Sequence, residues 1–197
     1  MKQTKGALPN AAKFFNANMR GGDYTFSSAI ADLIDNSIQA NSTNVEIAVD
    51  YSEKTVAIVD NGDGMNLATL DEAMKVAAET HEYSEEDLGR YGTGMKAASL
   101  SQARRVKVAS KARHGGSLHV QILDLDHITE TNDWNQLVIV GDEDDLPAEI
   151  LAHFKSSSGT AVIWESLDRV FDDDKMSEQE AYAELTAQVE EARSHIG

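Results

Sequence analysis

An acidic and an amide side chain, Asp32 and Asn36, lie four residues apart in the stretch formed by residues 27–40 (SSAIADLIDNSIQA). Apolar residues recur in this stretch with the spacing of one buried helical stripe, at Ile30, Leu33, Ile34 and Ile38. On such a helix Asp32 and Asn36 lie one turn apart on a single face. A carboxylate stacked on an amide can take part in polar chemistry, but the pair alone is more typical of a solvated helix face.

A second candidate is the glycine-rich turn of residues 60–65 (DNGDGM), which follows an apolar strand pattern. Asn-Gly and Asp-Gly pairs supply the positive φ of tight turns, so a plain turn is the simplest interpretation. The acidic residues also resemble the start of a calcium-binding loop. An EF-hand loop needs oxygen ligands at the positions of Gly62 and Gly64 and a glycine at the position of Met65, so calcium is not expected here.

Glycines recur in residues 89–103 (GRYGTGMKAASLSQA), at the start of a predicted helix. Glycines that open a helix leave its first N–H groups free to face an anion, which is how helix N-termini hold phosphate. The pattern alone is weak, because a dinucleotide-binding turn needs a strand directly before it. Here the polar, acidic residues 79–88 precede it, and we interpret them as a loop.

Composition narrows the classes of protein to which the chain can belong. Its 197 residues, 41% of them hydrophobic, suit one globular domain, and the net charge of −17 opposes direct binding to nucleic acid. The sequence has no cysteine, no apolar run that could span a bilayer and no signal peptide, so a cytoplasmic protein is expected. One basic cluster is interpreted as a strand with solvated edge charges: Arg104, Arg105, Lys107, Lys111 and Arg113.

Hydrophobic periodicity places helices and strands along the chain. Strands are predicted at residues 45–50, 55–60, 104–110, 117–126, 136–141 and 159–165, with turns at 51–54 and 114–116. Helices are predicted at 27–40, 66–78, 147–154 and 172–196, with a short one around Phe14, Phe15 and Met19. Asp23 or Ser27 is expected to cap the helix of residues 27–40. Inward-facing side chains are expected at Leu67, Leu70, Met74 and Ala77, and in the last helix at Met176, Ala183, Val189 and Ala192.

Four separated stretches resemble the conserved boxes of one ATPase superfamily, in the same order. They are ADLIDNS, DNGDGM, GRYGTGMKAAS and SGTAVIWE, which resemble the N, G1 and G2 boxes and the closing Gly-Thr of the GHKL ATPases. That superfamily includes DNA gyrase B, a class of heat-shock chaperones, histidine kinases and the mismatch-repair MutL proteins. The second glycine box is most similar to those of microrchidia-type and bacterial stand-alone members. The resemblance covers about residues 24 to 165.

The resemblance implies an α+β fold, the Bergerat ATP-binding fold. This is a two-layer α/β sandwich with a mixed, mostly antiparallel sheet covered by helices on one face. ATP and Mg²⁺ lie between the helices and the sheet, and residues 79–94 form a lid. The implied domains are an N-terminal segment (1–23), the ATP-binding domain (24–170) and an acidic C-terminal helix (171–197).

The resemblance also assigns roles to individual residues. Asn36 matches the asparagine that binds the magnesium ion, and Asp60 matches the aspartate that accepts a hydrogen bond from the adenine amino group. Thr160 matches a threonine that helps to hold adenine through water. Gly62, Gly64 and Met65 are expected beside the base. The phosphates are expected to lie against Gly92, Thr93, Gly94, Met95 and Lys96.

Asp32 occupies the position at which most members carry the glutamate that activates the attacking water. Aspartate keeps the carboxylate but is one methylene shorter, so it must approach the water more closely. The implied function is magnesium-dependent ATP binding with slow hydrolysis that drives a conformational or dimerisation cycle, with ATP and a nucleotide-dependent homodimer as partners.

Two other functions stay open at this point. The chain could be a nucleotide-binding switch that does not hydrolyse ATP, which the shorter Asp32 favours. It could also be the catalytic domain of a histidine kinase, although no histidine lies in a phosphoacceptor context. A protein with this fold that binds no nucleotide is the least favoured alternative, because it would not explain the presence of Asn36, Asp60 and the glycines at these positions.

Overall fold

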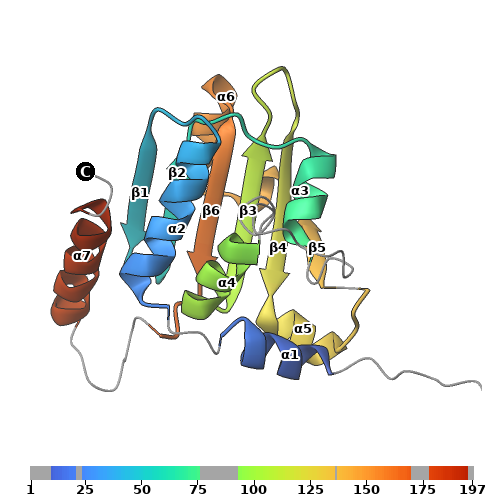
Figure 1. Ribbon diagram of the computed structural model, residues 1–197, viewed down its shortest axis with the longest axis vertical. Coiled ribbons are helices and arrows are strands. Elements are labelled where there is room, and N and C mark those ends of the chain that lie inside the picture. Colours follow the sequence, from blue (N-terminus) through green and yellow to red (C-terminus); the bar gives the residue numbers. More distant parts are fainter. Residues whose placement is uncertain (1–9, 21–23, 76–92, 136, 170–177, 195–197) are drawn as a thin grey trace, which may run out of the picture.

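The computed structural model describes residues 10–20, 24–75, 93–135, 137–169 and 178–194. Strands and helices alternate irregularly along these residues, as Figure 1 shows. The strands are β1 (Val45–Asp50), β2 (Thr55–Asp60), β3 (Arg105–Lys111), β4 (Leu118–Asp124), β5 (Val138–Gly141) and β6 (Gly159–Glu165). The helices are α1 (Ala11–Asn18), α2 (Phe26–Gln39), α3 (Leu67–Met74), α4 (Thr93–Gln102), α5 (Leu125–Thr131), η1 (Glu143–Asp145), α6 (Ala148–Ser156) and α7 (Glu178–Ser194).

The six strands form one sheet in the order β1-β2-β6-β3-β4-β5, and each of these pairings is antiparallel. The late strand β6 therefore lies between β2 and β3, which come much earlier in the chain (Figure 1). The predicted hairpin of residues 45–60 and the predicted strand of residues 159–165 have the bounds that the sequence indicated. The two-layer α+β architecture is confirmed.

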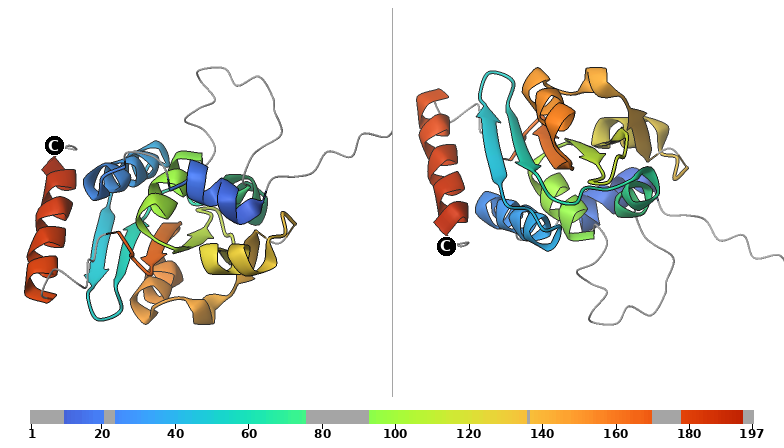
Figure 2. Two further views of the ribbon diagram at one scale, coloured as in Figure 1. Left: turned by 90° about the horizontal axis from the view of Figure 1, so that it is seen from below. Right: turned by 90° about the horizontal axis from the view of Figure 1, so that it is seen from above.

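The helices α2, α3 and α4 cover one face of the sheet (Figures 1 and 2). Because side chains alternate along a strand, every second residue of the central strands faces these helices. On β6 these are Val162 and Trp164, and the indole ring of Trp164 meets Phe26 of α2 edge to face, with ring centroids 5.7 Å apart. This layer holds the larger apolar core.

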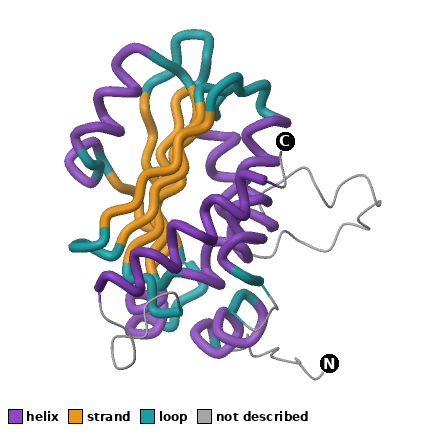
Figure 3. Tube along the Cα trace, turned by 90° about the vertical axis from the view of Figure 1, so that its left-hand side faces the viewer, coloured by secondary structure: helices purple, strands orange, loops and turns teal. Residues whose placement is uncertain are grey.

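The other face of the sheet carries the helix α6, which Figure 3 shows on the side opposite most of the helices. Ile150 and Phe154 of α6 pack against Ala161 and Ile163 of β6 and their neighbours on β2 and β4. The sheet thus has a helix on its second face as well, in a smaller apolar cluster. Helices were expected on one face only; with α6 in place, the two clusters together shield the central strands on both sides.

The helix α2 begins one residue earlier than predicted, and its cap differs from the expectation. Thr25 is the N-cap and forms a capping box with Ser28, whereas Ser27 lies inside the helix and Asp23 is outside the described residues. Ile38 was expected inside but is 53% exposed. A residue eight positions after Ile30 is rotated by about 80° around the helix axis, which carries Ile38 off the buried stripe.

Three other expectations were wrong. Leu67 on α3 is 46% exposed and Ala183 on α7 is exposed, because Leu70 and Leu185 take the buried positions. The helix α5 was missed, since the predicted strand ran through to residue 126. Asp124 ends that strand by accepting hydrogen bonds from the N–H groups of the next turn. Ala77 and Met176 lie outside the described residues.

The basic strand β3 is central in the sheet, and the expectation of solvated charges was wrong for its lysines, whereas the Arg105 side chain is 37% exposed. Lys107 is 8% exposed; its Nζ lies 2.7 Å from Glu165 and donates to the carbonyl oxygen of Asp145 at 2.8 Å. The ammonium group of Lys111 donates to the carbonyl oxygen of Phe154 on α6. These lysines therefore fasten α6 and η1 to the back of the sheet.

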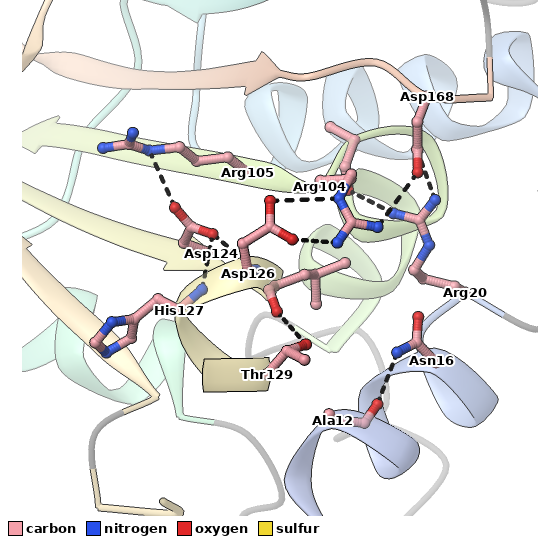
Figure 4. A network of polar contacts seen from close by, with 12 residues as sticks. Ala12, Asn16, Arg20, Arg104, Arg105, Asp124, Asp126, His127, Thr129 and Asp168 are labelled. Atoms are coloured by element: carbon pink, nitrogen blue, oxygen red, sulfur yellow. Dashed lines mark hydrogen bonds and ion pairs between the residues drawn. The ribbon is translucent and has the colours of Figure 1, made fainter. Parts of the chain in front are cut away.

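A network of ion pairs closes the lower end of the sheet (Figure 4). Arg20, which is 6% exposed, donates to Asp168 at 2.6 Å and to the carbonyl oxygen of Ala103 at 3.2 Å. Arg104 pairs with Asp126 and lies 3.6 Å from Asp168. The segment after α1 is thus joined to the ends of α4 and β6.

The C-terminal helix α7 packs against α2 and the first hairpin (Figure 1). Its buried residues are Leu185, Val189 and Ala192, and the ring of Tyr182 lies 4.4 Å from that of Tyr51. The acidic face of α7 points away from the core, so the helix extends the helical layer beside β1.

Gly159 offers a test of the contact between β2 and β6. Its φ is +134°, and a Cβ added there would come within 1.9 Å of the carbonyl oxygen of Asp60. We expect Gly159→Ala to lower the free energy of unfolding by well over ~1 kcal/mol, because backbone would have to move. Urea unfolding measures the loss.

Gly115→Ala is the matched control for this substitution. Gly115 also has a positive φ, +83°, but an added Cβ would meet open space. The control should lose only about 1 kcal/mol, the conformational term alone. Equal losses in the two variants would show that the close approach of β6 to Asp60 does not constrain the fold.

Candidate functional site

A cavity of about 400 Å³ lies between the helical layer and the sheet. It falls within the range of volumes typical of small-molecule sites. Its walls come from α2, β2, the turn after β2, α3, α4 and β6. The lining residues are Leu33, Asn36, Ser37, Gln39, Ala40, Ile58, Asp60, Gly64, Met65, Thr69, Ala73, Met95, Thr160 and Val162.

Asp60 is the buried charge of this cavity, with only 6% of its surface exposed. One carboxylate oxygen, Oδ1, accepts from the N–H groups of Gly62 at 2.7 Å and Thr160 at 3.2 Å. The other, Oδ2, lies 3.2 Å from the hydroxyl of Ser37. The pKa of Asp60 lies above its ordinary value, because burial raises it more than these three hydrogen bonds and the nearby His153 lower it. The carboxylate is thus held in place from three parts of the chain.

Strand register explains how these residues meet. Val59 of β2 is paired with Ala161 of β6, so Asp60 and Thr160 are neighbours at the same end of the sheet. Thr160 is in turn paired with Ser110 of β3. All three side chains lie on the helix-covered face, in a row across three strands. Ser110 had no role in the sequence analysis, because only the pairing of β3 with β6 places it here.

Ser110 joins the sheet to the turn that lines the cavity. Its hydroxyl donates to the carbonyl oxygen of Gly159 at 3.0 Å and accepts from the N–H of Met65 at 2.8 Å. The Thr160 hydroxyl lies 2.9 Å away. Because the single proton of Ser110 goes to Gly159, Thr160 is the donor in that contact. Ser110 is fully buried and holds Met65 against the cavity.

The glycine-rich turn is shaped by packing against neighbouring backbone. Gly64 has a φ of +63°, and a Cβ there would lie 2.0 Å from the carbonyl oxygen of Lys111. Asp63 accepts from Asn41 at 2.6 Å and pairs with Arg113 at 2.8 Å. Both carboxylates of the turn are therefore engaged within the protein.

The two polar residues of α2 occupy different positions relative to the cavity. Asn36 lines it, is exposed, and has no hydrogen-bond partner for its side chain among the residues described. Asp32 lies one turn earlier, is half-buried and is not part of the lining. Its Oδ2 accepts a hydrogen bond from the hydroxyl of Tyr24 at 2.9 Å. Tyr24 was not identified from the sequence.

The helix α4 brings its N-terminal end to the cavity. Met95 lines the cavity, and Gly94 is exposed with open space around its Cα. Lys96 does not line the cavity: it is 3% exposed, and its ammonium group donates to the carbonyl oxygen of Ala73, which is a lining residue. Burial lowers the pKa of Lys96 from 10.5 to about 8. The ammonium group of Lys96 therefore lies beside the cavity with little hydration, which disfavours its charged form.

The structure thus brings together half of the residues that the sequence singled out. The cavity is lined by Asn36, Asp60, Gly64, Met65, Met95 and Thr160, and Gly62 contributes its N–H to Asp60. Asp32 and Lys96 lie beside the cavity without lining it. Thr93 begins α4, whereas Gly92 and residues 79–91 of the expected lid lie outside the described residues.

The described residues contain neither a metal-binding cluster nor a membrane-spanning helix. No three histidine, aspartate or glutamate side chains within that part of the chain come together as a possible metal centre. Nor does any helix there have the length and apolar character needed to cross a membrane.

Comparison with known proteins identifies one family. A family model described as "Histidine kinase-, DNA gyrase B-, and HSP90-like ATPase" matches residues 24–160. The matched region contains every residue that lines the cavity except Val162. A search of curated proteins found no match to the chain.

The buried amine of Lys96 makes stability depend on pH in a testable way. Its pKa is about 8 in the folded protein and 10.5 in the reference state, so the unfolded chain binds more protons between these values. The contribution of Lys96 to the free energy of unfolding of the wild type therefore rises as the pH rises from about 8 to 10.5. Lys96→Met should be more stable relative to wild type at pH 7 than at pH 10.5, by about 3 kcal/mol.

Chemical denaturation of both proteins at several pH values measures this difference. Lys155→Met, at an exposed position on α6, controls for pH effects that do not depend on burial. A difference between Lys96→Met and wild type that stays constant from pH 7 to pH 10.5 would contradict the prediction.

Proposed function

The chain belongs to the histidine kinase-, DNA gyrase B- and HSP90-like ATPases, and we propose that its cavity binds ATP with Mg²⁺ and that the protein hydrolyses it slowly. In this proposal, hydrolysis drives a conformational or dimerisation cycle. The family match makes the region of residues 24–160 an ATP-binding domain. The binding of magnesium, the hydrolysis of ATP and the conformational or dimerisation cycle go beyond the family match and are our proposal.

The observation that carries the proposal is the buried carboxylate of Asp60 at an apolar cavity. An ionised carboxylate only accepts hydrogen bonds, and the amino group of adenine is a donor. Among the described residues Ser37 is the one hydrogen-bond partner of Asp60 Oδ2, and the Ser37 hydroxyl also lies 3.1 Å from the carbonyl oxygen of Leu33. Oδ2 therefore keeps a lone pair for the base. Ile58 and Val162 offer apolar surface for the ring.

The N-terminal end of α4 suits the phosphates. The first N–H groups of a helix have no partner within it and carry partial positive charge, which favours an anion there. Gly94 leaves this end open, because its exposed Cα has no atom near where a side chain would begin. Lys96 would reach the phosphates by exchanging the carbonyl oxygen of Ala73 for a phosphate oxygen. That exchange replaces a neutral acceptor with a charged one.

The donor set also fits a magnesium ion. Mg²⁺ is usually held by one or two protein oxygens, substrate phosphates and waters, and Asn36, which lines the cavity, carries an amide oxygen. When bound, the ion would neutralise charge that builds up on the phosphates. Asn36 would then hold the phosphates in register with the helix end.

Hydrolysis requires a base near the terminal phosphate, and Asp32 is our candidate. Asp32 would accept a proton from a water molecule as the oxygen of that water bonds to the γ-phosphorus. The bond between the γ-phosphorus and the bridging oxygen breaks, which leaves ADP and phosphate, and the proton passes from Asp32 to phosphate. Asp32 lies one helical turn from Asn36, within the same side of α2.

A second function, a nucleotide switch without hydrolysis, is favoured by one observation. Asp32 does not line the cavity, and its carboxylate is held by Tyr24. If Asp32 does not reach the attacking water, the protein binds ATP and releases it unchanged. Measurement of phosphate release separates the two functions.

The adenine assignment is tested by Asp60→Asn. An amide presents N–H groups where the base also presents a donor, so we expect ATP affinity to fall by about 100-fold or more. Isothermal titration calorimetry with ATP and Mg²⁺ measures this change, and circular dichroism checks the fold. Asp63→Asn makes the same chemical change in the same turn, outside the lining, and should keep its affinity. An unchanged dissociation constant for Asp60→Asn would contradict the nucleotide site.

The roles of the two α2 residues are separated by a pair of variants. Asp32→Ala should slow phosphate release by about 10²–10⁴-fold and keep its ATP affinity, because a general base acts only in the transition state. Asn36→Ala should instead weaken the binding of ATP in the presence of Mg²⁺. Asp35→Ala, at an exposed neighbouring position, is the control for both. Hydrolysis at the wild-type rate by Asp32→Ala would refute the assignment of the base.

A further inference from the structure

We propose that Tyr24 is a positioning residue for ATP hydrolysis, because its hydroxyl holds the Asp32 carboxylate in the orientation needed to accept a proton from water. This inference rests on the proposed function, since it requires Asp32 to act as the base. Tyr24 is not among the residues that line the cavity, and its role is to act through Asp32.

The contact between the two side chains is direct. The Tyr24 hydroxyl donates to Oδ2 of Asp32 at 2.9 Å, and both residues are half-buried. Within the described residues this is the one hydrogen bond that the Asp32 side chain makes. The second oxygen of Asp32, Oδ1, therefore keeps both lone pairs for a water molecule. Without Tyr24, the carboxylate could rotate freely about its side-chain bonds.

The backbone of Tyr24 is held by two contacts, one next to it in the sequence and one from α4. The next residue, Thr25, caps α2, so the backbone beside Tyr24 is fixed to the start of the helix that carries Asp32. The side chain of Gln102, at the end of α4, donates to the carbonyl oxygen of Tyr24 at 3.3 Å and to Ser101 at 2.8 Å. Gln102 is 4% exposed. Tyr24 thus connects the helix of Asp32 and Asn36 with the helix that offers its N-terminus to the phosphates.

The Tyr24 phenol remains protonated beside the Asp32 carboxylate, so it acts as a hydrogen-bond donor. The pKa of Tyr24 is raised by burial first, and then by the hydrogen bond and the negative charge of Asp32. The phenol therefore stays protonated at neutral pH and always donates to the carboxylate. A side chain one methylene shorter than glutamate has less reach, so holding it in one orientation matters more for the approach of water.

The test compares steady-state kinetics of Tyr24→Phe with wild type. We expect kcat to fall by about 10- to 100-fold, the usual loss when a residue that orients a reactive group is removed. KM and the dissociation constant for ATP should not change, because the ring remains and the cavity lining is intact. The melting temperature should fall by no more than it does in Tyr51→Phe, since each variant loses one hydrogen bond. A larger fall in melting temperature, or a loss of ATP affinity, would overturn the inference in favour of a structural role.

Tyr51→Phe is the matched control. The Tyr51 hydroxyl also makes a hydrogen bond, to the carbonyl oxygen of Tyr182 at 2.9 Å, but it fastens α7 to the first hairpin. Its loss should lower stability and leave kcat unchanged. A fall in kcat as large as that of Tyr24→Phe would show that any lost tyrosine hydroxyl slows the protein, and would overturn the inference.

A double variant asks whether Tyr24 acts through Asp32. If it does, Tyr24→Phe combined with Asp32→Ala hydrolyses ATP no more slowly than Asp32→Ala alone. Additive losses would overturn the inference. NMR of the protein with ¹³C-labelled tyrosine gives a readout without turnover: the Tyr24 signal, assigned by its absence in Tyr24→Phe, should shift in Asp32→Ala. No shift would show that the two side chains do not interact in solution.

Failure of the inference and failure of the proposed function have different signatures. If the wild type releases no phosphate above buffer, the hydrolysis part of the proposed function is wrong and the role of Tyr24 falls with it. If the wild type hydrolyses ATP, Asp32→Ala is slow and Tyr24→Phe is as fast as wild type, only the inference is wrong.

Discussion

The buried carboxylate of Asp60 sets the constraint on which the site depends. A charge removed from water is costly unless hydrogen bonds compensate for the lost hydration. The donors come from three separate segments: the turn through Gly62, the strand β6 through Thr160 and the helix α2 through Ser37. Each segment must therefore be in place for the others to be stable. The cavity is the space that this arrangement leaves between α2 and the sheet.

Contacts on the second face of the sheet also hold the turn that carries Asp60. The ring nitrogen Nε2 of His153 on α6 lies 3.1 Å from the carbonyl oxygen of Asp60, and Ser158 donates to the carbonyl oxygen of Gly62 at 2.8 Å. Lys111 reaches the end of α6 from β3. The backbone of Asp60 and of the turn that follows it is thus held from the face opposite the cavity. Motion of the turn is opposed from both layers.

Much of this fold could be predicted from local pattern. Strand alternation located β1, β2 and β6, and four boxes in order identified the family and six residues of the cavity. Long-range placement could not be predicted: Ser110 and Tyr24 have ordinary local contexts and gain their partners only through tertiary packing. The helix α5 was hidden because Leu123 and Leu125 continue a strand-like alternation, and only the capping by Asp124 ends it. Ile38 was misplaced because a strict four-residue spacing drifts around a helix.

The position of β6 between β2 and β3 has a consequence for biosynthesis. Thr160 is 100 residues after Asp60, so at typical rates of translation the ribosome needs about 5 to 20 s to supply the partner of β2. During that interval β2, and β3 once residue 111 has been made, present unpaired apolar edges, which are templates for association with other chains. Direct pairing of β2 with β3 would exclude β6 and abolish the cavity. No ligand can protect the nascent chain at this stage, because the cavity forms only when the last strand of the sheet has been made.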